Sequence, residues 1–109
     1  MLLSVNQDKV HTVLTAAGEI DLSTSGELDD SVVEALAQGT VHLTLDLSEV
    51  TFLDSSGLGV IVKALKRAKE AGTTFDVVVA NERVLKVFNL TGLDAVIDIY
   101  PTLDGAPGL

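Results

Sequence analysis

A segment in the middle of this 109-residue chain contains aspartate and serine side chains at a spacing that could support a chemical reaction or a binding site. It ends in Asp54-Ser-Ser-Gly-Leu-Gly59 and leads directly into apolar residues at helical spacing. Aspartate and serine at a helix start accept hydrogen bonds from backbone N–H groups that have no partner inside the helix. Gly57 and Gly59 are expected to leave the backbone there uncovered, so that another molecule can approach the hydroxyl of Ser56 closely.

Enzyme motifs do not fit this segment. A phosphate-binding P-loop requires G-x-x-x-x-G-K-[ST], and that spacing is absent. A hydrolase elbow G-x-S-x-G fails because Leu53 or Asp54 occupies the first glycine position. Neither His11 nor His42 is close in sequence to the serines. We therefore predict no catalytic residue. One possibility left open is a small nucleotide-binding or phosphate-handling enzyme, which binding of ATP or GTP to the isolated protein would favour.

Composition narrows the classes of ligand and partner. The chain has no cysteine and only two histidines, which lack ligand spacing, so neither a metal nor a cofactor is predicted. The formal net charge of -9 disfavours direct binding to nucleic acid or to anionic lipid and favours partners with a basic surface. No signal peptide and no apolar run of about 20 residues is present, and a cytoplasmic protein is expected.

Basic residues are concentrated in one short stretch. Four of the seven fall within residues 63–69, and they are Lys63, Lys66, Arg67 and Lys69. One interpretation is a solvated helix face with cations near the helix C-terminus, where the helix dipole favours them. The other is a surface that meets an acidic partner.

The first half of the chain predicts two strands, a helix and a further strand. Residues 10–17 are rich in β-branched and apolar residues, and a second short strand or turn follows at 18–21. Apolar residues then recur at helical spacing from Leu28 to Leu36, with Ser23 or Thr24 as N-cap and an end near Gly39. Residues 41–47 alternate apolar and polar side chains, which predicts a central strand buried chiefly on one face.

The second half predicts two helices and two strands. A helix over residues 58–71 ends at Gly72, and the apolar run 74–80 is a strand covered on both faces. Asn81 caps a helix that ends around residues 91–92, and a last strand occupies residues 95–100.

These elements predict one α/β domain over residues 1–109, with a loose tail from about residue 101. Right-handed crossovers make its sheet partly parallel and place the start of the 58–71 helix at the C-terminal end of a strand. In open α/β sheets, binding sites tend to lie at that end.

The run Asp46-Leu-Ser followed by Phe52-Leu-Asp-Ser-Ser-Gly-Leu-Gly59 resembles the signature of the STAS domain family, in particular of bacterial anti-sigma factor antagonists. Two further pieces are similar in kind: Gly18-Glu-Ile-Asp21 and the segment 84–93. The resemblance covers roughly residues 10–99. It implies a mixed sheet of four to five strands packed with three to four helices.

The resemblance also implies a function. The second serine of the motif, here Ser56, is the residue that is phosphorylated in such proteins. The unphosphorylated antagonist binds an anti-sigma factor that is also a serine kinase, and so releases a sigma factor; phosphorylation ends the binding and a serine phosphatase restores it. The expected partner-binding residues are Asp21, Asp54, Ser55, Gly57, Leu58 and Gly59.

Physical chemistry is consistent with such a switch. A phosphoryl group adds about -1.5 to -2 charges, which the N-terminal end of a helix tolerates. Across an interface, two unit charges about 6 Å apart repel by about 3 kcal/mol at an effective dielectric of about 20. Phosphorylation is therefore expected to change binding and not stability. The alternative is a STAS scaffold that does not switch, a subunit of a signalling or lipid-transport complex.

Overall fold

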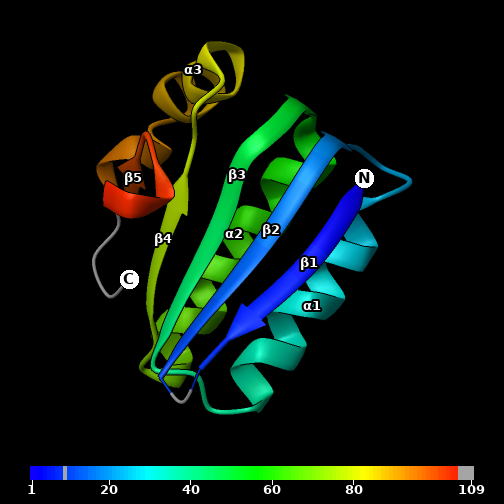
Figure 1. The fold of residues 1–109 in the computed structure, drawn as a ribbon. Coiled ribbons are helices and arrows are strands. Elements are labelled where there is room, and N and C mark those ends of the chain that lie inside the picture. The colour runs from blue at the N-terminus through cyan, green and yellow to red at the C-terminus, as the bar shows by residue number, and fades with distance from the viewer. Residues whose placement is uncertain (9, 106–109) are drawn as a thin grey trace.

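The computed structural model describes residues 1–8 and 10–105, which form a five-stranded sheet with helices packed on one face (Figure 1). The strand order follows the chain, β1-β2-β3-β4-β5, with β1 antiparallel to β2 and all other neighbours parallel. The predicted α/β class and mixed sheet are confirmed. The strands are β1 (Leu2–Gln7), β2 (His11–Ile20), β3 (His42–Leu53), β4 (Thr74–Val78) and β5 (Asp98–Tyr100).

Three α-helices connect these strands: α1 (Ser25–Ala37), α2 (Ser55–Ala71) and α3 (Glu82–Thr91). Asn81 caps α3 as predicted, because its side chain accepts hydrogen bonds from the N–H groups of Arg83 and Val84. Gly72 and Gly92 follow α2 and α3 with φ of 72° and 78°, the left-handed conformation that ends many helices. Thr24 is the N-cap residue of α1, but its side chain makes no capping hydrogen bond.

The first strand is not predicted by the sequence pattern. Residues 2–7 pair with residues 12–17 of β2, and most of β1 is exposed, so it lacks the regular apolar alternation that reveals a strand. A separate strand or turn is expected at residues 18–21, but residues 18–20 are instead the end of β2, and Asp21 follows it. Gly18, with φ of 94°, lies between two register shifts that let β2 continue along β3 as far as Ile20.

Other boundaries also differ from the predicted ones. β3 is 12 residues long and runs past the predicted end at residue 47 as far as Leu53. β4 ends at Val78, and β5 starts only at Asp98 because residues 93–95 form a 3-10 turn, η1 (Leu93–Ala95). In the predicted tail, Leu103–Gly105 forms a second 3-10 turn, η2, while residues 106–109 lie outside the described residues.

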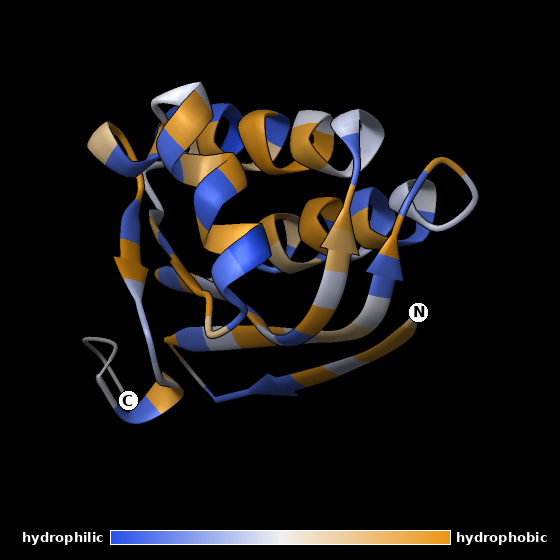
Figure 2. Cartoon of the chain, turned by 90° about the horizontal axis from the view of Figure 1, so that it is seen from above, coloured by the Kyte–Doolittle hydropathy of each residue, from blue (hydrophilic) through white to orange (hydrophobic). Residues whose placement is uncertain are grey.

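The main core lies between the sheet and the helices. Figure 2 shows this helical layer over one face of the sheet, with hydrophobic positions recurring along both. Leu43, Leu45 and Leu47 of β3 are fully buried and belong to one cluster with apolar residues of α1 and α2. Phe88 of α3 is also fully buried, and α3 packs at the end of the sheet where β3 and β4 finish (Figure 1).

Two polar positions of β3, Thr44 and Asp46, are buried as well, which corrects the expectation of a strand buried chiefly on one face. Thr44 and Asp76 are 0% and 2% exposed, and the Thr44 hydroxyl donates to Asp76 Oδ1 over 2.5 Å. His11 Nε2 lies 2.8 Å from Thr44 Oγ1, and His42 Nε2 lies 2.9 Å from Asp76 Oδ2. A polar network across β2, β3 and β4 therefore accounts for the hydrophilic residues in this part of the sheet.

Candidate functional site

The junction between β3 and α2 holds the predicted site. Asp54 is the N-cap residue of α2, with extended backbone angles (φ -94°, ψ -175°). Its Oδ1 accepts hydrogen bonds from the N–H groups of Ser56 (2.9 Å) and Gly57 (3.0 Å). The Ser56 hydroxyl donates to the same oxygen over 2.6 Å. The predicted cap is confirmed, and Asp54 also fixes the direction of the Ser56 hydroxyl proton.

Access to the motif differs from residue to residue. Ser55 is exposed, whereas Ser56, Leu58 and Gly59 are half-buried. Ser56 lies in the first turn of α2, where its hydroxyl is held by the hydrogen bond to Asp54.

The two glycines have different roles, which corrects the expectation that both uncover the backbone. A Cβ on Gly57 would lie 2.6 Å from Leu53 Cδ1 and 2.7 Å from Ile20 Cγ2. Gly57 is buried, and its missing side chain lets the start of α2 pack against the ends of β2 and β3. A Cβ on Gly59 would meet no atom within 4 Å, so the surface is open there.

The loop after β2 lies beside this junction. The N–H of Asp54 donates to the carbonyl of Ile20 over 3.2 Å, which joins the ends of β2 and β3. Asp21 follows at once, and its Oδ1 accepts hydrogen bonds from the Ser23 hydroxyl (2.7 Å) and the Thr24 hydroxyl (3.2 Å). Asp21 and Asp54 thus lie at the same end of the sheet, as expected.

Both carboxylates are held in the ionised form. The hydroxyl of Ser56, followed by the N–H of Gly57, lowers the pKa of Asp54 below its ordinary value of 3.8. The pKa of Asp21 is lowered in the same way, with the Ser23 hydroxyl as the largest cause. At neutral pH the surroundings of Ser56 therefore carry negative charge before any modification.

Two exposed apolar side chains lie near the ends of β2 and β3, and the sequence pattern does not distinguish them. Leu22 is 82% exposed and Phe52 is 48% exposed. Phe52, Arg83 and Val87 line a shallow groove of 270 Å³ between the end of β3 and α3. A contiguous exposed apolar patch is typical of a protein-binding surface, whereas single exposed apolar side chains are common on any protein surface. One feature of the sequence weakly predicts that Phe52 is exposed. Leu53 is the next residue, and two adjacent residues of a strand point to opposite faces of the sheet, so they cannot both face the same core.

The two histidines do not belong to the Ser56 site, and the described residues form neither a metal site nor a membrane-spanning helix. His11 and His42 are at the opposite ends of β2 and β3 from the serines, with ring centroids 4.6 Å apart, so they form no triad with Ser56. Among residues 1–8 and 10–105, no group of three or more His, Asp or Glu side chains could hold a metal ion. None of the helices in this part of the chain is long and apolar enough to cross a membrane.

The basic stretch lies on α2. Arg67 forms an ion pair with Asp29 of α1, while Lys63, Lys66 and Lys69 are exposed. Lys69 is in the last turn of the helix, where the dipole favours a cation. This arrangement agrees with a solvated helix face, and nothing in it requires an acidic partner.

Comparison with known proteins agrees with this geometry. The family model described as STAS domain matches residues 3–106. The anti-sigma-B factor antagonist of Bacillus subtilis is 33% identical over 103 residues, which are 94% of each chain. The crystal structure of an anti-sigma factor antagonist from Mycobacterium paratuberculosis has a TM-score of 0.87 at 31% identity, covering 94% of this chain and 87% of that one.

A third relative is similar in fold alone. The Bacillus cell fate determinant SpoIIAA in its phosphorylated form has a TM-score of 0.75 at 18% identity, covering 94% of each chain. The family assignment rests instead on the match to the family model over nearly the whole chain and on the 33% identity to a curated relative. The chain belongs to the STAS domain family.

Proposed function

We propose that this chain is an anti-sigma factor antagonist whose binding is switched off by phosphorylation of Ser56. The observation that carries the proposal is the Ser56 hydroxyl, which is half-buried at the first turn of α2 and hydrogen-bonded to Asp54. Its relatives support it, because they include proteins named anti-sigma factor antagonists. A protein of the same fold has been solved in a phosphorylated form.

In the proposed reaction, a partner kinase supplies ATP and Ser56 supplies the acceptor oxygen. The Ser56 Oγ bonds to the γ-phosphorus as the bond from that phosphorus to ADP breaks, and the hydroxyl proton is released. That proton already lies on the hydrogen bond to Asp54 Oδ1. A serine phosphatase hydrolyses the phosphate ester and restores the hydroxyl. The chain itself needs no catalytic residue.

The proposed docking surface is built around this hydroxyl. Asp21, Asp54, Ser55 and Gly59 form its polar and open part, and Leu22, Phe52 and the half-buried Leu58 supply apolar area. Gly57 contributes by seating α2 and not by direct contact. A partner with a basic surface suits the two ionised aspartates, and binding of nucleic acid or membrane forms no part of the proposal.

Phosphorylation opposes docking because it adds charge where charge is already negative. A phosphoryl group of about -1.5 to -2 charges comes to lie beside Asp54. Repulsion of about 3 kcal/mol across the interface corresponds to roughly a hundredfold loss of affinity. The partners that we propose are an anti-sigma factor with serine kinase activity and a serine phosphatase. We propose the cytoplasm as the compartment of this cycle.

The test is affinity capture from an extract of the source organism with wild type, Ser56→Ala and Ser56→Asp. We expect wild type and Ser56→Ala to retain an ATP-binding partner, identified by mass spectrometry, and Ser56→Asp to lose it. Incubation of the purified partner with ATP should add one phosphate to wild type. The matched control, Ser55→Ala, should still be phosphorylated, whereas Ser56→Ala should not.

Two results would contradict the proposal. Phosphate on Ser55 or on another residue would refute the site. Unchanged binding of every captured partner by Ser56→Asp would favour the scaffold that does not switch.

A further inference from the structure

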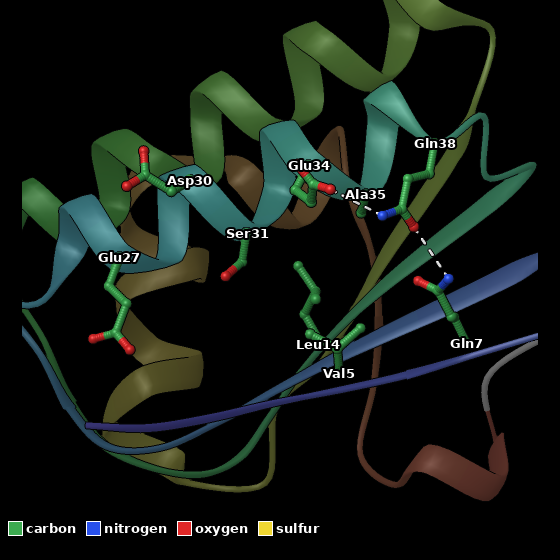
Figure 3. Close-up of a pocket in the computed structure, with 9 residues that line it drawn as sticks. All are labelled: Val5, Gln7, Leu14, Glu27, Asp30, Ser31, Glu34, Ala35 and Gln38. Atoms are coloured by element: carbon green, nitrogen blue, oxygen red, sulfur yellow. Dashed lines mark hydrogen bonds between the residues drawn. The ribbon is translucent and has the colours of Figure 1, made fainter.

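A second surface lies between α1 and β1, and β1 is the edge strand opposite to β5. A groove of 440 Å³ separates α1 from β1 and β2. Figure 3 shows Val5 and Leu14 rising from the strands toward α1. Together with Ala35 they form an apolar floor, and Val5 is 56% exposed. None of the residues that line this groove belongs to the Ser56 site.

The groove carries negative charge only. Glu27, Asp30 and Glu34 of α1 line it, and no described lysine, arginine or histidine does. Figure 3 shows Glu27 extending from α1 toward the strands. At the far end, Gln38 donates to Glu34 (2.9 Å) and accepts from Gln7 (3.1 Å). This pair of hydrogen bonds closes one end of the groove and leaves the carboxylates of Glu27 and Asp30 without a cationic neighbour in the lining.

The strand beside the groove is an open edge. β1 is first in the strand order and pairs only with β2 among the described strands. Its six residues pair without a register shift, and none of them is lysine or proline. Proteins usually blunt an exposed edge with lysine, proline, a bulge or a very short strand. The opposite edge follows that rule, since β5 has only three residues and is followed by Pro101.

We propose that the edge of β1 accepts an extended segment of a partner protein, with basic residues at alternate positions, as an added strand of the sheet. Backbone hydrogen bonds to β1 would supply affinity, and alternate side chains would supply specificity. Side chains on the face of Val5 would turn into the groove. Lysine or arginine fits there, because its aliphatic stem covers Val5 while its charged end reaches Glu27 or Glu34.

Charge decides between this occupant and a second copy of the chain. Two copies paired through β1 would bring together two grooves that are both lined by carboxylates. The net charge of -9 adds to that repulsion. A basic segment of another protein meets neither obstacle. This surface goes beyond the proposed antagonist function, and we expect phosphorylation of Ser56 to leave it unchanged.

The test uses a peptide, acetyl-Lys-Val-Lys-Val-Lys-Val-amide, titrated into the full-length ¹⁵N-labelled protein. We expect saturable amide shifts in residues 2–7 and in α1. A peptide of the same composition in the order Lys-Lys-Lys-Val-Val-Val cannot alternate and should bind more weakly. Raising the salt from about 0.05 M to about 0.5 M should weaken the binding, because screening shortens the reach of the carboxylates.

Two matched double variants distinguish the effect of charge in the groove from the effect of the net charge of the protein. Glu27→Gln with Glu34→Gln should raise the dissociation constant by up to about tenfold, because each exposed ion pair that is lost contributes a modest part of the binding energy. Glu70→Gln with Asp94→Asn removes the same charge from outside the groove and should change it less than about twofold. Capture of the Ser56 partner should be unaffected by either pair, so the two proposals can fail separately.

Four results would overturn the proposal. They are the absence of saturable shifts, shifts centred on Asp21 and Ser56, equal weakening by both pairs of variants, and a dimer paired through β1 in sedimentation and amide-exchange measurements of the free protein.

Discussion

At the scale of single residues, Asp54 connects the fold of the site to its chemistry. One carboxylate oxygen caps α2 and also holds the Ser56 hydroxyl. The cap needs an acceptor only, whereas the lowered pKa of Asp54 shows that these donors favour the charged form. An amide in the same place keeps an acceptor for the two N–H groups and loses the charge.

Asp54→Asn should therefore be less stable than wild type at neutral pH, and the difference should depend on pH. The folded pKa of Asp54 lies below its ordinary value of 3.8, so its charge contributes stability above that pH. This contribution is lost as the pH falls through the folded pKa. Urea unfolding of both proteins from pH 7 to pH 2.5 measures it. Asp8 and Asp21 also have lowered pKa values, but they are present in both proteins and cancel in the difference. A difference that stays constant over this range would contradict the assignment.

The two glycines of the motif give a second prediction at this scale. Gly57→Ala should destabilise the protein by about 1–3 kcal/mol, because a Cβ there would overlap the side chains of Leu53 and Ile20. Gly59→Ala is the matched control: it meets no atom within 4 Å. It should be neutral or stabilising by up to about 1 kcal/mol, since alanine favours a helix interior. Chemical denaturation of both variants is the measurement, and equal effects would refute the packing role of Gly57.

At the scale of elements, the three central strands are joined by side chains as well as by their backbones. The Thr44 hydroxyl has one proton, which it donates to Asp76, so its oxygen accepts from His11 Nε2. Asp76 also accepts from His42, and the Thr74 hydroxyl lies 2.5 Å from His42 Nδ1. Each of the three strands thus contributes to one network at the end of the sheet opposite to Ser56.

Asp76→Ala should destabilise the protein by about 3 kcal/mol, because it leaves the buried donor of Thr44 and the half-buried donor of His42 without their acceptor. The measurement is the free energy of unfolding in urea at pH 7. Asp94→Ala, at an exposed position, should change it by less than about 0.5 kcal/mol. A small effect of Asp76→Ala would show that water replaces the lost acceptor.

At the scale of the whole molecule, the two proposed surfaces occupy different parts of one sheet. The Ser56 site lies where β2 and β3 end, and the acidic groove runs along the β1 edge beneath α1 (Figures 1 and 3). Their separation allows the chain to change its affinity at one surface without rearranging the other. A switch of this kind requires that the fold itself tolerate the added charge.

Ser56→Asp should therefore leave the free energy of unfolding within about 1 kcal/mol of wild type, because a negative charge in the first turn of α2 is favoured by the helix dipole. The same variant should lose partner binding. Thermal and urea unfolding, read beside affinity capture, measure the two effects in one protein. A strongly lowered unfolding midpoint would mean that lost binding reports a damaged fold and not a switch.

Features that depend on neighbouring residues follow from the amino-acid sequence alone. Asn81, Gly72 and Gly92 bound their helices as predicted, and Asp54 caps α2, because a cap involves only three or four consecutive residues. The Asp54-to-Gly59 motif and its resemblance to the STAS family likewise require no knowledge of the fold.

Features that depend on residues far apart in the chain arise only when the chain is folded. β1 forms a strand because it pairs with β2. A glycine is required at position 57 of α2 because Ile20, at the end of β2, lies against it. His11 and His42 are well separated in the sequence, yet parallel pairing of β2 with β3 brings their rings together. Such contacts arise from strand register and crossover connections, which local periodicity does not encode.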